Sequence, residues 1–203
     1  MRKWKTRPVA GSPRIGMVVA TYKQDAQLRG LAASLQSQTY KNFCALAVHD
    51  GPAEDIYRKA WPTDDPRFEW DELPARKNEF GHPSRRHGFT QFAGRVDYLC
   101  NTNGDCWYAP VYFESMLNQI QAADADFVYC NMVHSHKLWA PLTTSIGRSC
   151  IDTGCWIAKA SLVLTALPDW TGNEFAADWT FIEKMMALKP KTTKNGGFYY
   201  IHN

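Results

Sequence analysis

The segment Asn103-Gly104-Asp105 carries the residue types of a site that binds a metal ion and a phosphate. It follows an apolar run and stands ahead of Pro110, a residue that suits the first turn of a helix. An acid at the point where a strand of an α/β sheet ends has its side chain turned outward, a usual place for such a site. A turn or a helix cap also explains Asp105, so both interpretations stay open for this segment alone.

The adjacent residues Arg85 and Arg86 are a second candidate for binding phosphate. The net charge of +3 is small, and the basic residues do not form the broad basic face that nucleic-acid recognition shows. The arginine pair fits a small ligand that bears phosphate, and a solvated charge pair explains it equally well. We therefore expect no nucleic-acid partner.

His134 and His136 have the alternate spacing that places two side chains on one face of a strand. No carboxylate accompanies them in the sequence, which favours a surface or acceptor-loop role over a metal pair. The six cysteines include no Cys-x-x-Cys pair and have mostly apolar or aromatic neighbours, which indicates reduced, largely buried thiols. A structural zinc site remains an alternative, drawn from a histidine and Cys100, Cys106, Cys150 and Cys155.

Length and composition predict one domain. The chain has 203 residues, of which 45% are hydrophobic and 21% charged, enough to bury one core. No apolar run reaches the roughly 20 residues that a membrane span needs, and the basic start lacks the apolar core of a secretory signal. We expect a cytoplasmic protein without a membrane span, with a flexible basic arm over residues 1–13 and the folded domain over 14–203.

The order of elements predicts an α/β fold with a mostly parallel central sheet flanked by helices. Continuous apolar runs at 15–20 and 43–48 flank a helical stripe at 25–37, which is a strand–helix–strand unit. Such a unit implies parallel strands, and ligands bind beyond their carboxyl ends. Further strands are expected at 68–73, 96–100, 126–131 and 151–158, further helices at 54–60, 89–93, 111–122 and 179–188, and an irregular functional loop at 74–88.

With these elements placed, the chain resembles the family 2 glycosyltransferases of the GT-A fold, in a small, minimal form. The resemblance covers about residues 14–203 and depends on several motifs in the family's order. These are Val-Val-Ala-Thr-Tyr at 18–22, Gln-Thr-Tyr-Lys-Asn-Phe at 38–43, His-Asp-Gly-Pro at 49–52, Asn-Gly-Asp at 103–105, Ala-Asp-Trp at 177–179 and Tyr-Ile-His-Asn at 200–203. Three residues depart from the family pattern, namely His49, Pro52 and Asn103.

The resemblance implies that one group of residues binds a UDP-sugar donor. Asp50 would hydrogen-bond the uracil edge, and the arginine pair, with Arg86 preferred, would bind the diphosphate and hold a flexible loop over it. The whole group comprises Thr21, Tyr22, Asp50, Arg85, Arg86, Asn103 and Gly104. The resemblance also implies metal ligation by Asp105 and His202, and mixed oxygen and imidazole ligands suit Mn²⁺ (or Mg²⁺).

The resemblance further implies an inverting transfer of a hexose to an unknown glycan, lipid or protein acceptor. Asp178 would be the base that takes the acceptor proton, although helix propensity alone explains it as the N-cap of 179–188. Asp152 would line the acceptor side and is the alternative base. We also expect slow hydrolysis of the donor.

Two other functions remain as alternatives. The first is a nucleotide-sugar binding protein without catalysis, because Asn103 replaces an acid. The second is a nucleotidyltransferase, although residues 21–24 lack the glycine-rich turn that such enzymes place after the first strand.

Overall fold

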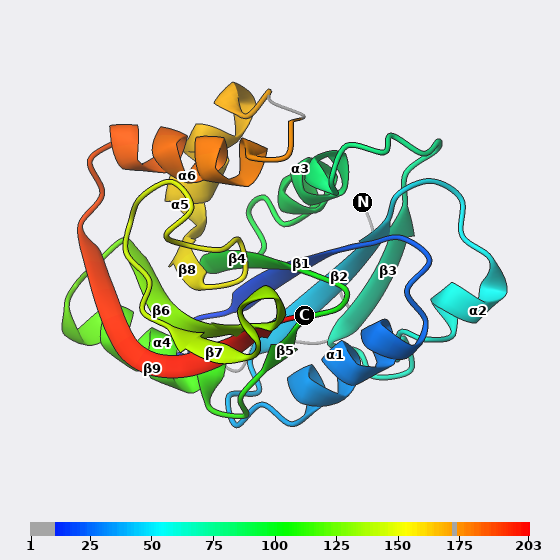
Figure 1. Ribbon diagram of the computed structural model, residues 1–203, viewed down its shortest axis with the longest axis horizontal. Helices are drawn as coiled ribbons and strands as arrows, with labels where there is room; N and C mark the ends of the chain where they lie inside the picture. Colours follow the sequence, from blue (N-terminus) through cyan, green and yellow to red (C-terminus); the bar gives the residue numbers. More distant parts are fainter. Residues whose placement is uncertain (1–10, 172–173) are drawn as a thin grey trace.

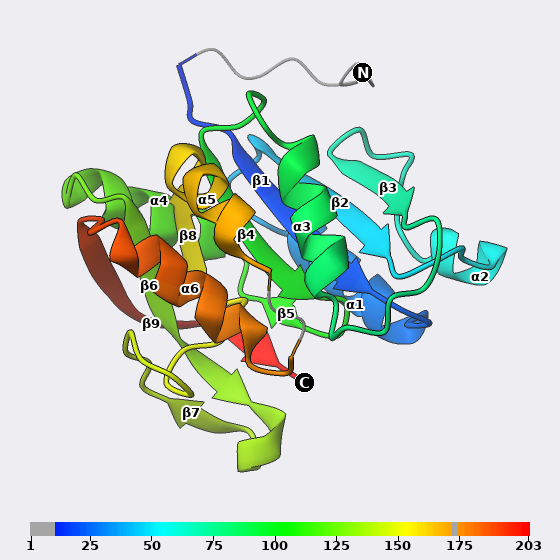
Figure 2. The same cartoon turned by 90° about the horizontal axis from the view of Figure 1, so that it is seen from above.

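The structure is a computed structural model that describes residues 11–171 and 174–203. Within these residues the strands form one sheet of nine strands in the order β3-β2-β1-β4-β8-β6-β9-β5, with β7 paired to β6. Figures 1 and 2 show α3, α5 and α6 over one face of the sheet and α1 and α4 over the other. This layering buries both faces of the central strands.

The N-terminal half of the sheet is a run of four parallel strands. These are β1 (Ile15–Thr21), β2 (Phe43–His49), β3 (Phe68–Glu72) and β4 (Tyr98–Asn103). Both β1 and β2 are buried along their whole length, as their continuous apolar sequences predict. The predicted helix at 25–37 is confirmed as α1 (Ala26–Gln36), and β3 lies at the edge of the sheet, whereas α2 (Asp55–Arg58) is shorter than expected.

The region 74–88 is not the irregular loop that the sequence predicts, because α3 (His82–Gln91) begins inside it. Gly81 and Pro83, which suggested a loop in the sequence, instead lie at the start of the helix. Gly81 has a φ of 79° directly before it, and Pro83 lies in its first turn, where a missing N–H costs nothing. A Cβ on Gly88 would lie 2.4 Å from Val18 Cγ1, so this glycine lets α3 pack closely on β1. The arginine pair is therefore on a helix.

The C-terminal half contains strands in both directions. Its strands are β5 (Trp107–Tyr108), β6 (Phe127–His134), β7 (Ala140–Leu142), β8 (Trp156–Lys159) and β9 (Thr192–His202). The strand β8 runs antiparallel to β4 and β6, while β9 runs parallel to β6 and antiparallel to β5. Six strands, β1 to β4 with β6 and β9, share one direction, so the predicted α/β fold with a mostly parallel sheet is confirmed.

Several elements of this half differ from the prediction. The extended segment at 151–158 is a strand only over β8, and β9 was not predicted at all. The helix expected at 179–188 is α6 (Ala177–Ala187), so Asp178 lies in its first turn and is not its N-cap. The remaining helical elements are α4 (Tyr112–Ala122), which was predicted, and α5 (Ala160–Ala166), η1 (Ser135–Lys137) and η2 (Leu167–Asp169), which were not.

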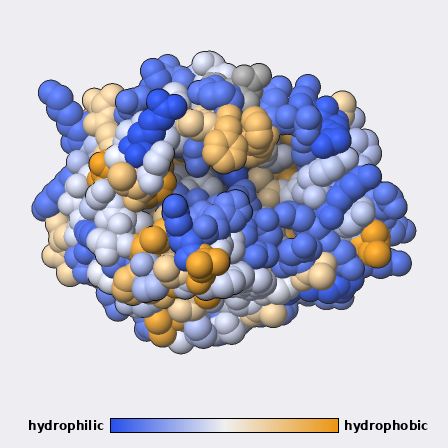
Figure 3. All heavy atoms as spheres, viewed as in Figure 1, coloured by the Kyte–Doolittle hydropathy of each residue, from blue (hydrophilic) through white to orange (hydrophobic). Residues whose placement is uncertain are grey.

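The cysteines are buried largely as their apolar neighbours in the sequence predict. The six cysteines are free, and all but Cys150 are buried, which confirms largely buried thiols. Figure 3 shows one face of the molecule as mostly hydrophilic, with hydrophobic residues in small separate patches. None of the helices found in residues 11–171 and 174–203 is long and apolar enough to cross a bilayer. The predicted arm at 1–13 falls largely on residues 1–10, which lie outside the described residues.

Candidate functional site

A cavity of about 320 Å³ opens where the parallel strands β1, β2 and β4 end. This is the edge of an open sheet at which ligands bind. The cavity is lined by Ala20, Thr21, Tyr22, Gln24, Asp50, Arg76, Asn78, Phe80, Gly81, Asn103, Asp105 and Phe175. Five of the side chains predicted to bind donor or metal thus surround one space, namely Thr21, Tyr22, Asp50, Asn103 and Asp105.

Asp50 shapes one wall of this cavity. Its side chain is buried, and its two carboxylate oxygens accept hydrogen bonds from the backbone N–H groups of Lys77 and Asn78, each at 2.8 Å. On the same wall the guanidinium carbon of Arg76 lies 4.1 Å from the ring centroid of Tyr22. Asp50 therefore fixes the loop before α3 against the ends of the strands.

Gly104 permits a close approach to two side chains that line the cavity. A Cβ at this position would lie 2.5 Å from Gln24 Oε1 and 2.9 Å from Thr21 Oγ1. The Thr21 hydroxyl donates to Gln24 Oε1 at 3.2 Å, so this side-chain pair is itself held in place. A larger residue at 104 would displace these two side chains, which line the cavity.

The two neighbouring arginines point to different places. Arg85 is 2% exposed and donates to Phe80 O at 3.0 Å and to Asn103 Oδ1, which lines the cavity. Burial lowers the pKa of Arg85, while the charges of Asp178 and Asp152 oppose that shift. Arg86 instead contacts Glu79 at 3.7 Å and Trp170 O at 3.5 Å. Of the two arginines, Arg85 and not the preferred Arg86 hydrogen-bonds a residue that lines the cavity, so Arg85 is the better candidate for binding phosphate.

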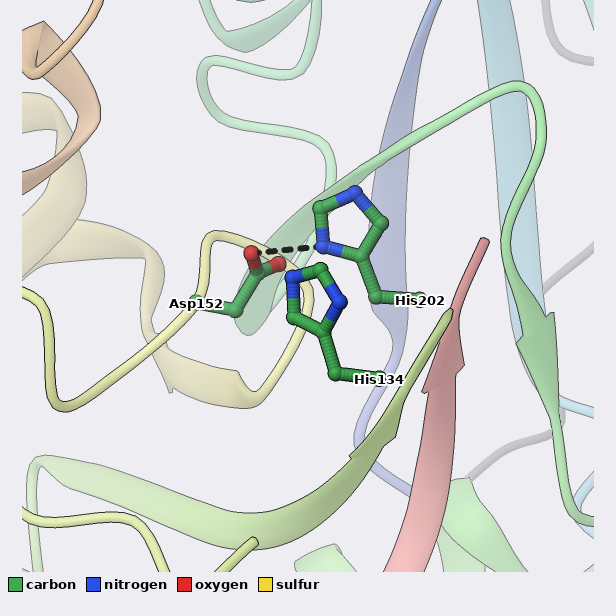
Figure 4. Close-up of side chains that lie close together, drawn as sticks. All are labelled: His134, Asp152 and His202. Atoms are coloured by element: carbon green, nitrogen blue, oxygen red, sulfur yellow. Dashed lines mark hydrogen bonds and ion pairs between the residues drawn. The ribbon is translucent and has the colours of Figure 1, made fainter. Parts of the chain in front are cut away.

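A cluster of potential metal ligands lies beside this cavity in the sheet. The ligand atoms of His134, Asp152 and His202 all lie within 4.8 Å of one another. Figure 4 shows the two imidazoles next to each other, both on one side of the carboxylate. His134 is the register partner of His202 in the β6–β9 pair, so two residues 68 positions apart become neighbours. Asp152, far from His134 in the sequence, is thus a carboxylate close to it in space, while His136 is not part of the cluster.

Asp152 is held by three hydrogen bonds. Its Oδ1 accepts from the Tyr200 hydroxyl at 2.7 Å and from Gly154 N–H at 3.0 Å, and its Oδ2 lies 2.9 Å from His202 Nδ1. Burial would raise the pKa of Asp152, but the hydrogen bond and charge of His202, with the bonds from Tyr200 and Gly154, lower it to about 2. Asp152 is therefore a firmly ionised carboxylate.

The charges of three acids act on His202. Burial lowers the pKa of His202, but its hydrogen bond to Asp152 and the charges of Asp152, Asp105 and Asp178 outweigh burial and raise that pKa. The charge of Asp105 thus acts on His202, although Asp105 lies outside the three-residue cluster. Because Nδ1 pairs with Asp152, the imidazole presents Nε2 away from that carboxylate, as Figure 4 shows.

Asp178 lies at the start of α6. Its Oδ1 accepts the backbone N–H of Trp179 at 2.7 Å. Burial raises the pKa of Asp178, the charge of Asp152 adds to that shift, and the N–H of Trp179 and the charge of Arg85 oppose it. The two predicted catalytic acids therefore have pKa values shifted in opposite directions, an arrangement that separates their roles.

The sequence pattern of glycosyl transferase family 2 matches residues 17–165. This match covers most of the chain, and the chain belongs to that family. The chain is also 28% identical over 123 residues to the putative glycosyltransferase EpsH of Bacillus subtilis (strain 168), a match that covers 59% of this chain and 34% of that relative. The chain thus spans about a third of the length of this curated relative.

Solved structures confirm the GT-A fold. S. aureus TarS 1-349 in complex with UDP-GlcNAc has a TM-score of 0.76 at 15% identity, covering 93% of this chain and 58% of that one. The mannosyltransferase PcManGT from Pyrobaculum calidifontis, in complex with GDP-Man and Mn²⁺, has a TM-score of 0.71 at 13% identity, covering 99% and 60%. At such identities the likeness shows the fold alone.

Proposed function

We propose that this chain transfers a hexose from a UDP-sugar to an acceptor hydroxyl, with inversion and with a divalent cation. One observation carries the proposal. The cavity at the strand ends is lined by Asp50, Asn103 and Asp105, and the charges of Asp105 and of Asp178 both act on His202. TarS bound to UDP-GlcNAc and PcManGT bound to GDP-Man and Mn²⁺ support the donor class and the cation. The acceptor is a glycan, a lipid or a protein.

The residues present fit a cation such as Mn²⁺ or Mg²⁺. Asp105 would provide a carboxylate and His202 an imidazole nitrogen, a mixed donor set that suits Mn²⁺. Asp152 occupies Nδ1 of His202 and so orients Nε2, as carboxylates commonly do for metal-binding histidines. When bound, the cation would neutralise the charge that develops on the leaving diphosphate.

His134 is better suited to supporting this arrangement than to ligation. Its Nδ1 accepts a hydrogen bond from the backbone N–H of His136 at 3.1 Å, so the neutral ring carries its proton on Nε2. A protonated nitrogen cannot bind a cation. His134 therefore packs against His202, with 4.4 Å between ring centroids, and presents an N–H to the side of Asp152.

Asp178 is the better base of the two candidates. A carboxylate with a pKa of about 2 and three hydrogen bonds is a weak proton acceptor, which removes Asp152 from that role. Asp178 has a raised pKa, and the N–H of Trp179 is bonded to its Oδ1 and not to its Oδ2. In the proposed step the acceptor oxygen bonds to the anomeric carbon, the bond from that carbon to the diphosphate breaks, and Asp178 takes the proton. Water in place of the acceptor would give slow hydrolysis of the donor.

The two alternatives make different demands on the site. A non-catalytic binding protein needs the cavity but not the raised pKa of Asp178. A nucleotidyltransferase needs a phosphate-binding turn after the first strand, where this chain has Tyr22, Lys23 and Gln24. Glycosyl transfer uses both the cavity and the acids.

The test is release of nucleoside diphosphate from a panel of UDP-sugars and GDP-sugars, with Mn²⁺, with Mg²⁺ and with chelator. We expect cation-dependent release from one or two UDP-sugars, abolished by Asp105→Ala. Binding of UDP without release from any donor would favour the non-catalytic protein. Release from GDP-sugars alone would contradict the uridine assignment to Asp50.

A further inference from the structure

The side-chain amide of Asn103 has a fixed orientation. Its Oδ1 accepts a hydrogen bond from Nη2 of Arg85. A guanidinium group carries donors only, so the amide atom that faces it must be the oxygen. The amide nitrogen therefore lies on the other arm of the group, away from Arg85.

The loss of the hydrogen bond from Arg85 to Asn103 Oδ1 would be costly. The side chain is buried, Nη1 is shared between Phe80 O and His82 Nδ1, and Nε has no hydrogen-bond partner in the described part of the chain. Burial lowers the pKa of His82 to about 4, so that imidazole is neutral and its Nδ1 can accept from Arg85 Nη1. Within residues 11–171 and 174–203 no carboxylate lies within ion-pair distance of Arg85. Losing Asn103 Oδ1 would leave a buried cation with one fewer acceptor.

The amide nitrogen of Asn103 is available to a ligand. Asn103 lines the cavity, and among the described residues its nitrogen donates to no protein acceptor. The oxygen, the atom that a cation would need, is already used by Arg85. The position therefore offers the cavity an N–H donor.

We propose that Asn103 binds the donor substrate through its amide N–H groups, which donate to a phosphate oxygen, and that it is not a cation ligand. This inference depends on the proposed nucleoside diphosphate donor. Phosphate oxygens only accept hydrogen bonds, and the cavity has Arg76 on its wall and the buried Arg85 behind Asn103. The change from acid to amide at 103 thus converts a cation-binding position into an anion-binding one.

The test is Asn103→Asp, with inorganic pyrophosphate and UDP as probes. The new carboxylate pairs with Arg85, so the variant keeps its fold, but it has no N–H to donate. Calorimetry in chelator should show the affinity for both probes falling about 10- to 100-fold, the worth of a hydrogen bond to a charged group. Uridine affinity and Mn²⁺ affinity of the nucleotide-free protein, the latter measured by electron paramagnetic resonance, should stay at the parent's values.

Asn78→Asp is the matched control. Asn78 lines the same cavity, and its Oδ1 accepts from Arg76 Nη2 at 2.7 Å, but both of these residues are exposed. The substitution adds the same negative charge without removing a fixed donor. Any loss that the two variants share is the effect of charge alone, and the excess loss at 103 measures the N–H donor.

A measurement on the parent protein needs no folded variant. In a ¹⁵N–¹H spectrum the side-chain NH₂ signals of Asn103, assigned by their absence from Asn103→Asp, should move downfield when pyrophosphate is added. Unmoved signals, or an Asn103→Asp variant that binds pyrophosphate like the parent and Mn²⁺ about tenfold more tightly, would overturn the inference. An equal loss for uridine and UDP would overturn the assignment to phosphate. A parent that binds no nucleotide and no pyrophosphate, even with Mn²⁺, would instead contradict the proposed function itself.

Discussion

The N-terminal and C-terminal halves of the sheet contribute to the site in different ways. In the N-terminal half the polar side chains at the strand ends are committed to protein partners, as Asp50 is to the backbone of residues 77 and 78 and Asn103 to Arg85. In the C-terminal half Asp152 pairs with His202, and the charge of Asp178 acts on His202. The first half is therefore a shaped binding surface, and the second half holds the groups whose protons and charges can change.

The largest effect that this division predicts is the loss of turnover in Asp178→Asn. The amide cannot take the acceptor proton, so the release of nucleoside diphosphate should fall about 10²- to 10⁴-fold. Nucleotide affinity, measured by calorimetry, should not change, because all but one of the residues that line the cavity belong to the other half. Glu183→Gln, an exposed acid on the same helix, is the control and should behave like the parent. Normal turnover by Asp178→Asn together with an inactive Asp152→Asn would contradict the assignment of Asp178 as the base.

Asp152→Asn should lower the affinity for the cation more than it lowers the rate of the chemical step. The amide no longer provides the charge that orients Nε2 of His202, so Mn²⁺ affinity should fall about 10- to 100-fold. The measurement is Mn²⁺ binding to nucleotide-free protein by electron paramagnetic resonance. Asp126→Asn, which removes an acid paired with Lys159 at 2.8 Å elsewhere in this half, should leave Mn²⁺ affinity unchanged. Equal losses in the two variants would indicate a general charge effect.

Two glycines allow the halves to be perturbed separately. Gly88→Ala places a methyl group 2.4 Å from Val18 Cγ1 and should push α3, which carries Arg85, away from the cavity. Gly154→Ala places one 2.3 Å from the Tyr200 ring and should break its hydrogen bond to Asp152. Each should cost about 1–3 kcal/mol in the free energy of unfolding, measured by urea titration.

Their binding defects should differ. Gly88→Ala should weaken the binding of UDP in chelator and leave Mn²⁺ affinity unchanged, whereas Gly154→Ala should do the reverse. If both variants lost both affinities, the two halves would not be separable parts of the site.

The smallest expected effect concerns acid stability in the N-terminal half. The hydrogen bond from Arg58 holds the pKa of Glu72 at about 2, below its ordinary value of 4.5. Because the folded pKa is lowered, the pair stabilises the fold above pH 4.5 and loses that contribution as the pH falls toward 2. The melting temperature of Glu72→Gln should therefore lie below the parent's at neutral pH, and the gap should close across this window. A gap that persists at pH 2 would contradict the linkage.

The N-terminal half of the sheet could be predicted from the sequence better than the C-terminal half. The strands β1 and β2 are buried on both faces, so their apolar runs identify them, and the parallel arrangement then brings Thr21, Asp50 and Asn103 to one edge. The strand β9 has no such pattern. It is polar and half-exposed, contains Gly196 and Gly197, and pairs with β6 across two register shifts.

The cluster of His134, Asp152 and His202 was missed from the sequence for the same reason. His134 becomes a neighbour of His202 only through the β6–β9 pairing, so no local spacing could have indicated their cluster with Asp152. Arg85 was placed on a flexible loop because Gly81 and Pro83 are typical of loops as well as of helix starts. Its burial depends on the packing of α3 against β1, which is a property of the tertiary structure.

The pairing of β9 also ties the activity to the completion of folding. This strand joins β6 to β5, its only partner within the described residues, and delivers His202 beside residues that precede it by 50 and 68 positions. Such distant pairings form only after the loops between them have closed. A chain in which β1 to β4 have formed but β9 has not would therefore have most of the cavity lining and lack the imidazole proposed to bind the cation.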